Sequence, residues 1–245
     1  MYMDNISLSK HSSYNIGDSI YYSLRKNIIS VNFKPGEALS IKEISEKLNV
    51  SRSPVRDALI KLGKEGLVDI IPQKGTSVSK IDLKRVDEER FLRNSLEENA
   101  IRLFIKMYKE SDIAILRNNI EMQKQSLNCN DYLSFLDYDD SFHSVFFKSI
   151  DKTMCWEILQ SMCGHYRRVR LMSLWDDKIL TNVVTQHQQI IENICHKNFD
   201  KAIEMSQTHL TKISMEETEL IKKYPEFFKE QDDDNFLIKD FYNRI

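Results

Sequence analysis

The chain has 245 residues, a hydrophobic share of 41% and a formal net charge of −2, values typical of a globular protein with one large or two ordinary domains. No apolar run reaches transmembrane length and the N-terminus lacks a signal-peptide pattern, so we expect a cytoplasmic protein without a membrane segment. The four cysteines form no C-x-x-C pair, which favours free thiols in a reducing compartment. Residues 1–80 carry 12 Lys and Arg against 8 Asp and Glu, which indicates a basic head on an acidic body.

Glycine and proline divide the chain into two unequal parts. Five of the six glycines and three of the four prolines precede residue 77, and only Gly164 and Pro225 follow it. Turn-forming residues followed by a long stretch almost free of helix breakers predict a small mixed domain at 1–80 and an all-helical domain at 81–245.

A helix-turn-helix is predicted around residue 50. Ser40 and Glu43 form a capping box that opens the first helix. Ser53 is expected to cap the second helix, with Pro54 at the first helical position, where no N–H partner is needed. Three apolar side chains at i, i+4 and i+7 anchor this second helix, namely Val55, Leu59 and Leu62.

Two arginines, Arg52 and Arg56, lie off this apolar stripe near the exposed N-terminal end of the second helix. Such a helix fits the major groove of DNA, because arginine is the preferred bidentate partner of guanine. The hydroxyl groups of Ser51 and Ser53 at the helix N-terminus suit phosphate. The alternative is an ordinary surface helix with solvated arginines, and periodicity alone leaves both interpretations open.

A β-hairpin is predicted after the helix-turn-helix, with strands at 67–71 and 76–80. A hairpin in this position is a wing. Its tip carries Lys74 beside Gly75, and a glycine lets the backbone approach a groove or a phosphate closely. A further amphipathic helix is expected at 19–29, before the helix-turn-helix.

Residues 20–80 resemble the winged helix-turn-helix of the GntR family of bacterial transcription regulators. The matching stretches are Pro35-Gly36-Glu37, Val50-Ser51-Arg52-Ser53-Pro54-Val55-Arg56-Asp57-Ala58-Leu59, Glu65-Gly66-Leu67-Val68 and Lys74-Gly75. The family usually has Thr at Ser53 and Glu at Asp57, and both replacements keep the chemistry. The resemblance implies binding to double-stranded DNA through six residues: Ser51, Arg52, Ser53, Arg56, Lys74 and Gly75. A single helix-turn-helix reads too few bases, so we expect a homodimer on a palindromic operator.

The body is predicted to be an antiparallel bundle of helices joined by short linkers. The expected ranges are about 82–109, capped by Asp82, then 111–127, capped by Ser111, followed by 131–149, 153–173, 181–197 and 199–223. The inward candidates of the first helix are Val86, Leu96, Ala100, Leu103 and Met107. The predicted fold is therefore mainly α, a winged helix-turn-helix with a small β-hairpin followed by an all-α bundle.

Both ends of the chain carry weaker patterns. Residues 1–15 are polar and lack a period, which predicts a loose arm. The segment 225–245 is highly charged and then amphipathic, and two interpretations stay open: a terminal helix that docks on a partner subunit, or a mobile tail.

One carboxylate and three histidines of the body are candidate metal ligands: Asp139, His143, His187 and His209. Asp139 and His143 are four residues apart and share one helix face. The other two lie on later helices, and side chains from three helices can converge in a bundle core on a divalent transition metal. Spacing alone is a weak signal, because each histidine could instead be an ordinary core or surface residue.

The body resembles the FCD ligand-binding domain of the FadR-like subfamily of GntR regulators. That domain has D-x-x-F-H, then a His opening H-x-x-I, then a His before Leu in the last helix. All four positions match here, with separations of 4, 44 and 22 residues. The resemblance implies a metal site at these residues. Zinc is the first choice, and ligand type does not separate it from nickel or manganese.

Arg93 lies in Arg93-Asn94-Ser95-Leu96-Glu97, which matches the R-x-x-L-E of the same domain. The resemblance implies that Arg93 faces the metal and binds the carboxylate of a small effector, a role that suits a guanidinium. The alternative is a surface arginine paired with Glu97 at i+4. Three more arginines form a basic cluster on a later helix: Arg167, Arg168 and Arg170. A solvated face is favoured for them, with the alternative that one of the three lines the pocket. The remaining histidines, His11, His165 and His196, are interpreted as structural or surface residues.

These features together predict a DNA-binding transcription regulator whose operator binding is controlled by a small carboxylic acid bound near a metal. The alternative is a metal-dependent hydrolase or lyase acting on a small acid. The sequence lacks H-E-x-x-H and a distinct general base, and an enzyme would have no use for the basic winged head. We therefore expect a protein that is not an enzyme.

Overall fold

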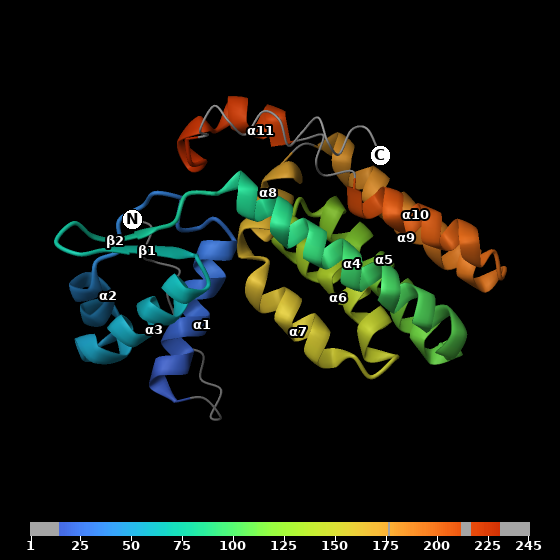
Figure 1. The fold of residues 1–245 in the computed structure, drawn as a ribbon, viewed down its shortest axis with the longest axis horizontal. Helices are drawn as coiled ribbons and strands as arrows, with labels where there is room; N and C mark the ends of the chain where they lie inside the picture. Colours follow the sequence, from blue (N-terminus) through green and yellow to red (C-terminus); the bar gives the residue numbers. More distant parts are fainter. Residues whose placement is uncertain (1–14, 176, 212–216, 231–245) are drawn as a thin grey trace.

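The computed structural model describes residues 15–175, 177–211 and 217–230. Their elements are α1 (Ile16–Ile29), α2 (Ile41–Leu48), α3 (Arg52–Lys64), β1 (Val68–Ile71), β2 (Gly75–Val78), α4 (Leu83–Met107), α5 (Glu110–Asn128), α6 (Tyr132–Lys148), α7 (Thr153–Met162), α8 (Gly164–Ser173), α9 (Asp177–Cys195), α10 (Phe199–Thr211), α11 (Glu217–Lys223) and a 3-10 turn (Pro225–Phe227). Figure 1 shows a small head, from α1 to β2, beside a larger helical body that begins with α4. The predicted mainly α fold is confirmed.

The head has its own apolar core, in which α1 and α3 pack together with α2 and the hairpin. The Ser40 side chain accepts a hydrogen bond from Glu43 N at 3.2 Å and caps α2 as predicted. The predicted cap of α3 is wrong, because the helix already begins at Arg52 and its N-cap is Ser51. Pro54 therefore lies in the first turn, where the backbone N–H groups lack intrahelical partners and a proline is tolerated.

The wing is a two-stranded antiparallel hairpin in the register Val68↔Val78 and Ile71↔Gly75. The turn is closed by a hydrogen bond of 3.0 Å from Lys74 N to Ile71 O. The other edge of β2 is also occupied, since Leu39 N donates to Thr76 O at 2.8 Å. The predicted hairpin is thus present, and a short extended segment holds it against the head.

The body follows the predicted helices with one main difference, because the helix expected at 153–173 is two helices that break at Cys163. The break lets α8 begin against the head: a Cβ atom at Gly164 would lie 2.6 Å from Leu67 Cδ2, so only glycine fits there. The linker and α8 are joined further by His165, whose Nδ1 accepts from Asp82 N at 3.1 Å and whose Nε2 lies 2.9 Å from Gly66 O.

Other predictions for the body need smaller corrections. Helix α4 is capped by Asp82 as expected, but Leu103 and Met107 are exposed, because the C-terminal half of the helix turns Ile101, Phe104 and Ile105 toward the core instead. Helix α5 begins one residue before Ser111, with Lys109 at the N-cap position. In the range 199–223, α10 and α11 are described, while 212–216 lie outside the described residues.

The chain termini are only partly described. Most of the predicted arm, residues 1–14, and the amphipathic part of the tail, from residue 231, lie outside the described residues. The first part of the tail contacts the linker between head and body: Ile81 N donates to Phe227 O at 2.8 Å, and Lys229 N donates to Ile81 O at 2.9 Å. Phe227 and Phe228 are buried, so this segment is part of the core of the body.

Candidate metal centre and DNA-binding surface

The four predicted ligands come together in the core of the body. Asp139 and His143 lie one turn apart on α6, His187 lies on α9 and His209 on α10, and all four are buried. One ligand atom from each lies within 4.8 Å of the other three. His187 Nε2 and His209 Nε2 are 3.2 Å apart, and His209 Nε2 and His143 Nε2 are 3.3 Å apart. Asp139 Oδ1 lies 3.5 Å from His187 Nε2. The side chains therefore form one buried Asp-His₃ cluster that could hold a metal ion.

Each histidine of the cluster has an oxygen atom beside its other ring nitrogen. His143 Nδ1 lies 2.7 Å from Glu97 Oε2, His187 Nδ1 lies 3.0 Å from Gln123 Oε1, and His209 Nδ1 lies 3.0 Å from Gln186 Oε1. A carboxylate or amide oxygen accepts a hydrogen bond, so these partners favour the tautomer with the proton on Nδ1. The Nε2 lone pairs of all three rings then point toward the common centre, as metal ligands require.

The electrostatics of His187 and His209 favour neutral imidazoles beside an ionised Asp139 carboxylate. Burial lowers the pKa of His187 to about 3 and the pKa of His209 well below its usual value. The pKa of Asp139 is lowered although burial opposes this, chiefly because the Arg170 guanidinium stabilises the charged form. Neutral imidazole and carboxylate are the ligand forms that bind divalent transition metals.

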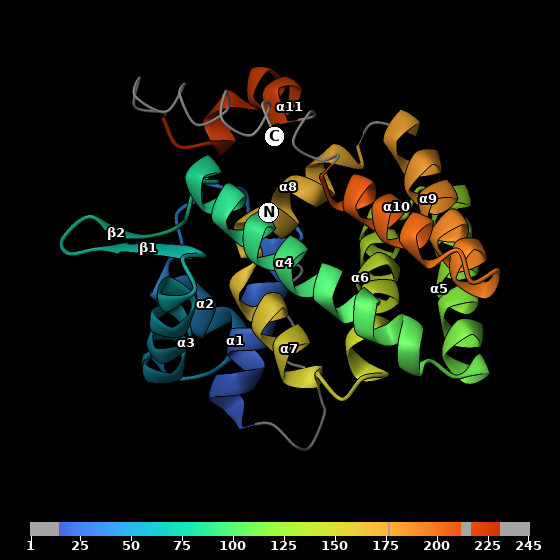
Figure 2. The same ribbon diagram turned by 45° about the vertical axis from the view of Figure 1, so that its right-hand side comes forward.

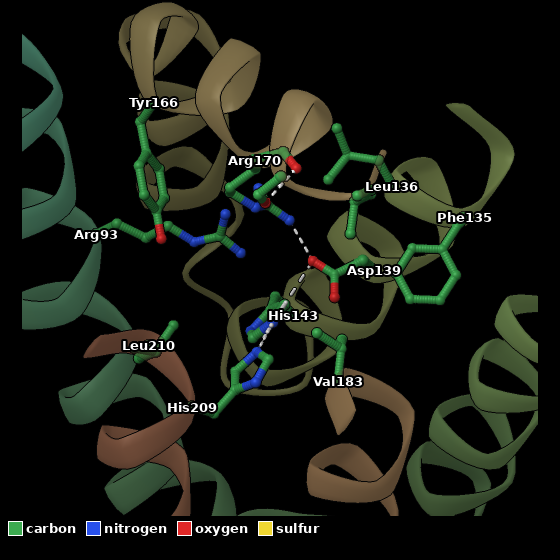
Figure 3. Close-up of a pocket in the computed structure, with 12 residues that line it drawn as sticks. Arg93, Phe135, Leu136, Asp139, His143, Tyr166, Arg170, Val183, His209 and Leu210 are labelled. Atoms are coloured by element: carbon green, nitrogen blue, oxygen red, sulfur yellow. Dashed lines mark hydrogen bonds and ion pairs between the residues drawn. The ribbon is translucent and has the colours of Figure 1, made fainter. Parts of the chain in front are cut away.

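Beside the cluster lies a small cavity of about 40 Å³, shown in Figure 3. Its wall includes Arg93, Tyr166, Arg170, Asp139 and His143. Arg93 is buried and donates to Glu97 Oε1 at 2.6 Å, so it pairs with Glu97 but is not a surface residue. Although burial opposes it, the pKa of Arg93 is raised by the Glu97 carboxylate, which keeps the guanidinium charged. A cationic group and the ligand cluster thus face the same cavity.

The solvated face favoured for Arg167, Arg168 and Arg170 is wrong for the two buried residues, Arg168 and Arg170, and the alternative that one of the three lines the pocket is correct for Arg170. Arg170 is buried and donates to Asp139 and, at 2.8 Å, to Asp140 Oδ1, so it lines the cavity. Arg168 is fully buried on the head side of α8, where it donates to Ser79 O at 2.7 Å. Buried arginines need carboxylate or carbonyl partners, and here α6 and the linker provide them.

Some partners of the site could not be recognised in the sequence. Glu97 is predicted only as a partner of Arg93, whereas Gln123 and Gln186 carry no spacing signal that separates them from other glutamines. For Arg170, the sequence does contain a signal: Asp139 and Asp140 are adjacent, and two neighbouring buried carboxylates require nearby cations.

Of the other histidines, His165 is buried between head and body, His196 is exposed, and His11 lies outside the described residues. All four cysteines are free thiols.

The predicted DNA-binding residues lie on two exposed parts of the head. Ser51, Arg52, Ser53 and Arg56 are exposed at the N-terminal end of α3. The opposite face of that helix is buried in the head core through the predicted anchor residues, Val55, Leu59 and Leu62. Lys74 and Gly75 are exposed at the tip of the wing, and Gly75 has a φ of +111° with open space within 4 Å on the side where a Cβ atom would lie. The N-terminal end of α3 and the tip of the wing therefore expose basic and small residues to solvent.

This combination of a winged helix-turn-helix with an all-α body around a buried Asp-His₃ cluster defines a class, the two-domain bacterial transcription regulators. The family model for bacterial regulatory proteins of the gntR family matches residues 16–78, and the model for the FCD domain matches residues 90–212. The chain therefore belongs to the GntR family, with an FCD domain, and is a DNA-binding transcription regulator.

Relatives in other bacteria agree with this assignment. The HTH-type transcriptional repressor RspR of Escherichia coli is 31% identical over 217 residues, which is 88% of this chain and 95% of that protein. The gluconate operon transcriptional repressor of Bacillus subtilis is 30% identical over 209 residues, covering 82% and 83%. These relatives are named as regulators, which confirms the prediction that the chain is not an enzyme.

Two solved structures share the fold. A GntR regulator from Rhodococcus superposes with a TM-score of 0.71 at 22% identity, covering 85% of this chain and 98% of that one. Escherichia coli McbR/YncC has a TM-score of 0.71 at 17% identity, covering 86% and 99%. Among the described residues, every helix is too short or too polar to cross a membrane.

Proposed function

We propose that this regulator is a homodimer whose binding to a palindromic operator is controlled by a small carboxylic acid, bound beside a divalent transition metal in the body. Residues 1–80 form the DNA-binding domain, and residues 81–245 form the metal-binding, effector-binding and dimerising domain. Zinc is the first choice of metal, with nickel and manganese as alternatives. A regulator of bacterial chromosomal genes works in the cytoplasm, where we place this protein.

The spacing of the four ligand atoms is the observation that carries the metal proposal. A tetrahedral zinc site with bonds of about 2.05 Å has ligand atoms roughly 3.3 Å apart. Three of the separations between ligand atoms are 3.2, 3.3 and 3.5 Å, and all four atoms lie within 4.8 Å of one another. Three lone pairs and a carboxylate this close together repel one another, so a cation at their centre would stabilise the arrangement.

The cavity supports an effector that is both small and anionic. A water molecule requires about 10–15 Å³ on this scale, so a cavity of about 40 Å³ holds roughly three waters or a compact carboxylate. Arg93 and Arg170 supply guanidinium groups, which recognise carboxylates with two parallel hydrogen bonds. One relative is named for a gluconate operon, and gluconate, although larger than this cavity, carries the same carboxylate group.

Helix α8 offers a direct route from the cavity to the head. Tyr166 and Arg170 line the cavity, while His165 and Arg168 contact Gly66 and Ser79 at the edge of the head. An effector that binds Arg170 would bias the position of α8, and α8 would carry this change to the head. Such coupling requires that α8 has two positions, with and without effector, and that the effector binds one of them more tightly than the other.

Metal analysis of the purified protein tests the metal proposal. We expect about one transition metal per chain in the wild-type protein and none in a His187→Ala/His209→Ala variant, while the exposed His196→Ala control keeps the metal. A DNA sequence that the wild-type protein binds is first selected from a random pool. Binding of the same three proteins to this DNA is then measured by fluorescence anisotropy while gluconate and other small carboxylates are added. Wild-type protein without metal would refute the site. DNA binding that no carboxylate changes would refute the proposed control.

A further inference from the structure

One exposed face of α3 carries both basic and apolar side chains. Arg52, Arg56 and Ile60 follow one another at i, i+4 and i+8, so they lie along the same face of the helix. Both arginines are exposed, and Ile60 is exposed to 44%. Lys64 continues this stripe one turn further and is also exposed. An isoleucine therefore lies between positively charged side chains on the surface expected to bind DNA.

The wing adds a second isoleucine at this point. Ile60 and Gly63 on α3 and Ile70 on β1 line one groove of about 410 Å³. A Cβ atom at Gly63 would lie 3.5 Å from Ile70 Cδ1, so the strand and the helix are in close contact there. In Figures 1 and 2, β1 lies between β2 and α3, and the hairpin projects away from the body. Ile70 is exposed to 47%, so the two isoleucines form one apolar patch between α3 and the wing.

The surroundings of the patch indicate which kind of partner covers it. Contiguous exposed apolar surface marks an interaction site more often than single exposed residues do. Arg56 lies one turn before Ile60 and Lys64 one turn after it, and positive charges attract the phosphate backbone of DNA. A partner that fits this surface combines negative charge with an apolar group.

Double-stranded DNA has such an apolar group in its major groove. The base edges there present hydrogen-bond donors and acceptors, and thymine adds its 5-methyl group. One helical turn separates Arg56 from Ile60, about 6 Å along the axis of α3, which is less than two base-pair steps of about 3.4 Å. A helix that places Arg56 at a base edge thus brings Ile60 within reach of a neighbouring base pair.

We propose that Ile60 is a specificity-determining residue that contacts the 5-methyl group of a thymine in the operator, with Ile70 of the wing bordering the same contact. The inference rests on the proposed function, because it requires α3 to be the recognition helix. Arginine recognises guanine through hydrogen bonds, so the two arginines of α3 cannot provide this discrimination. The protein should therefore distinguish thymine from uracil, which lacks only the methyl group.

Replacement of thymine by deoxyuridine tests this contact, because it removes the methyl group and keeps the hydrogen-bonding groups of the base. Each thymine of the DNA selected from the random pool is replaced in turn, and binding is measured by fluorescence anisotropy. With wild-type protein, one position of each half-site should lose about 4-fold in affinity, the factor that corresponds to about 0.8 kcal/mol for one buried aliphatic carbon. With Ile60→Ala, the same replacement should leave the affinity unchanged.

Two further variants make the result specific to Ile60. Ile60→Val keeps an apolar side chain with one carbon fewer and should retain part of the methyl effect. Ile115→Ala changes an isoleucine of α5 that is exposed to 50%, and it should keep the full effect. Thermal unfolding should show that all three variants are folded, because both positions are exposed. An equal loss of affinity in wild type and Ile60→Ala, or no loss at any thymine, would overturn the proposal.

The outcomes separate this contact from the proposed function. Specific DNA binding that depends on Arg52 and Arg56 but on no thymine methyl group would overturn the contact and leave the function standing. A methyl effect that disappears in Ile60→Ala, on DNA whose binding no carboxylate changes, would support the contact and overturn the proposed effector control.

Discussion

Glu97 on α4 lies 2.7 Å from Nδ1 of His143 on α6, and the same carboxylate accepts a hydrogen bond of 2.6 Å from Arg93. One buried residue thus joins the candidate effector-binding arginine to a candidate metal ligand. Its pKa is lowered to about 2 although burial opposes this, because Arg93 and then His143 stabilise the charged form. Removing this carboxylate should therefore change both parts of the site.

Replacing Glu97 with Ala should weaken zinc binding by about 10- to 100-fold, because His143 would lose the acceptor that orients its ring. Glu97→Gln should keep most of the affinity, since an amide oxygen still accepts from Nδ1–H. Competition with a chelating dye measures the affinity. Equal zinc binding in wild type and Glu97→Ala would show that Glu97 does not orient His143.

Arg93→Ala should weaken the effect of small carboxylates on DNA binding by about 10-fold or more, because a charge-assisted pair contributes roughly 1.5–3 kcal/mol. The metal content should stay at the wild-type value. Fluorescence anisotropy with increasing carboxylate measures the response, and Arg102→Ala, an exposed arginine paired with Glu98 on the same helix, is the matched control. An unchanged response would remove Arg93 from the effector site.

Arg52→Ala/Arg56→Ala should abolish specific operator binding at physiological salt, because base contacts of this kind contribute about 1–3 kcal/mol each and phosphate contacts add to them. Both side chains are exposed, so the fold and the proposed dimer should be unaffected. The affinity is measured at several salt concentrations, against Lys42→Ala on α2 as an exposed control. Specific binding retained by the double variant would exclude α3 as the recognition helix.

Acid should destabilise the protein partly through His165. Burial, and then the charge of Arg168, lowers its pKa to about 3 in the folded protein, while the unfolded chain has about 6.5. The unfolded state therefore takes up the proton first, and stability that is present above pH 6.5 is lost as the pH falls from about 6.5 toward 3. Other groups face this ring, namely Arg85 and Asp82.

In the variant His165→Gln, the free energy of unfolding should fall less steeply with decreasing pH than in wild type. The two slopes should differ by up to about 1.4 kcal/mol per pH unit, the value for one proton. Urea unfolding at pH 7.5, 6.5 and 5.5 measures the slope, with the exposed His196→Ala as control. Equal slopes in wild type and His165→Gln would mean that His165 does not contribute to the acid sensitivity.

Local patterns predicted most of the secondary structure. Ser40 and Asp82 cap α2 and α4 as expected, since a cap depends on hydrogen bonds within a few residues. The predicted cap at Ser53 was wrong because the backbone is already helical at Arg52, and Ser51 occupies the N-cap position without a hydrogen bond from its side chain. The break at Cys163 was not predicted from periodicity, because apolar residues continue on both sides of it, and the close approach of Gly164 to Leu67 of the head is visible only in the tertiary structure.

The amino-acid sequence alone was sufficient to predict a winged head and a helical body, because periodicity and caps are encoded locally. The four residues of the Asp-His₃ cluster were predicted from the resemblance of the body to the FCD domain, since their spacing alone is a weak signal. Only the tertiary structure could decide where the charges of α8 lie: Arg170 turns into the cavity and Arg168 toward the head. The same is true of Glu97, Gln123 and Gln186 beside the three histidines. The burial and partners of a charged side chain depend on helices distant in sequence, so no local pattern could have determined them.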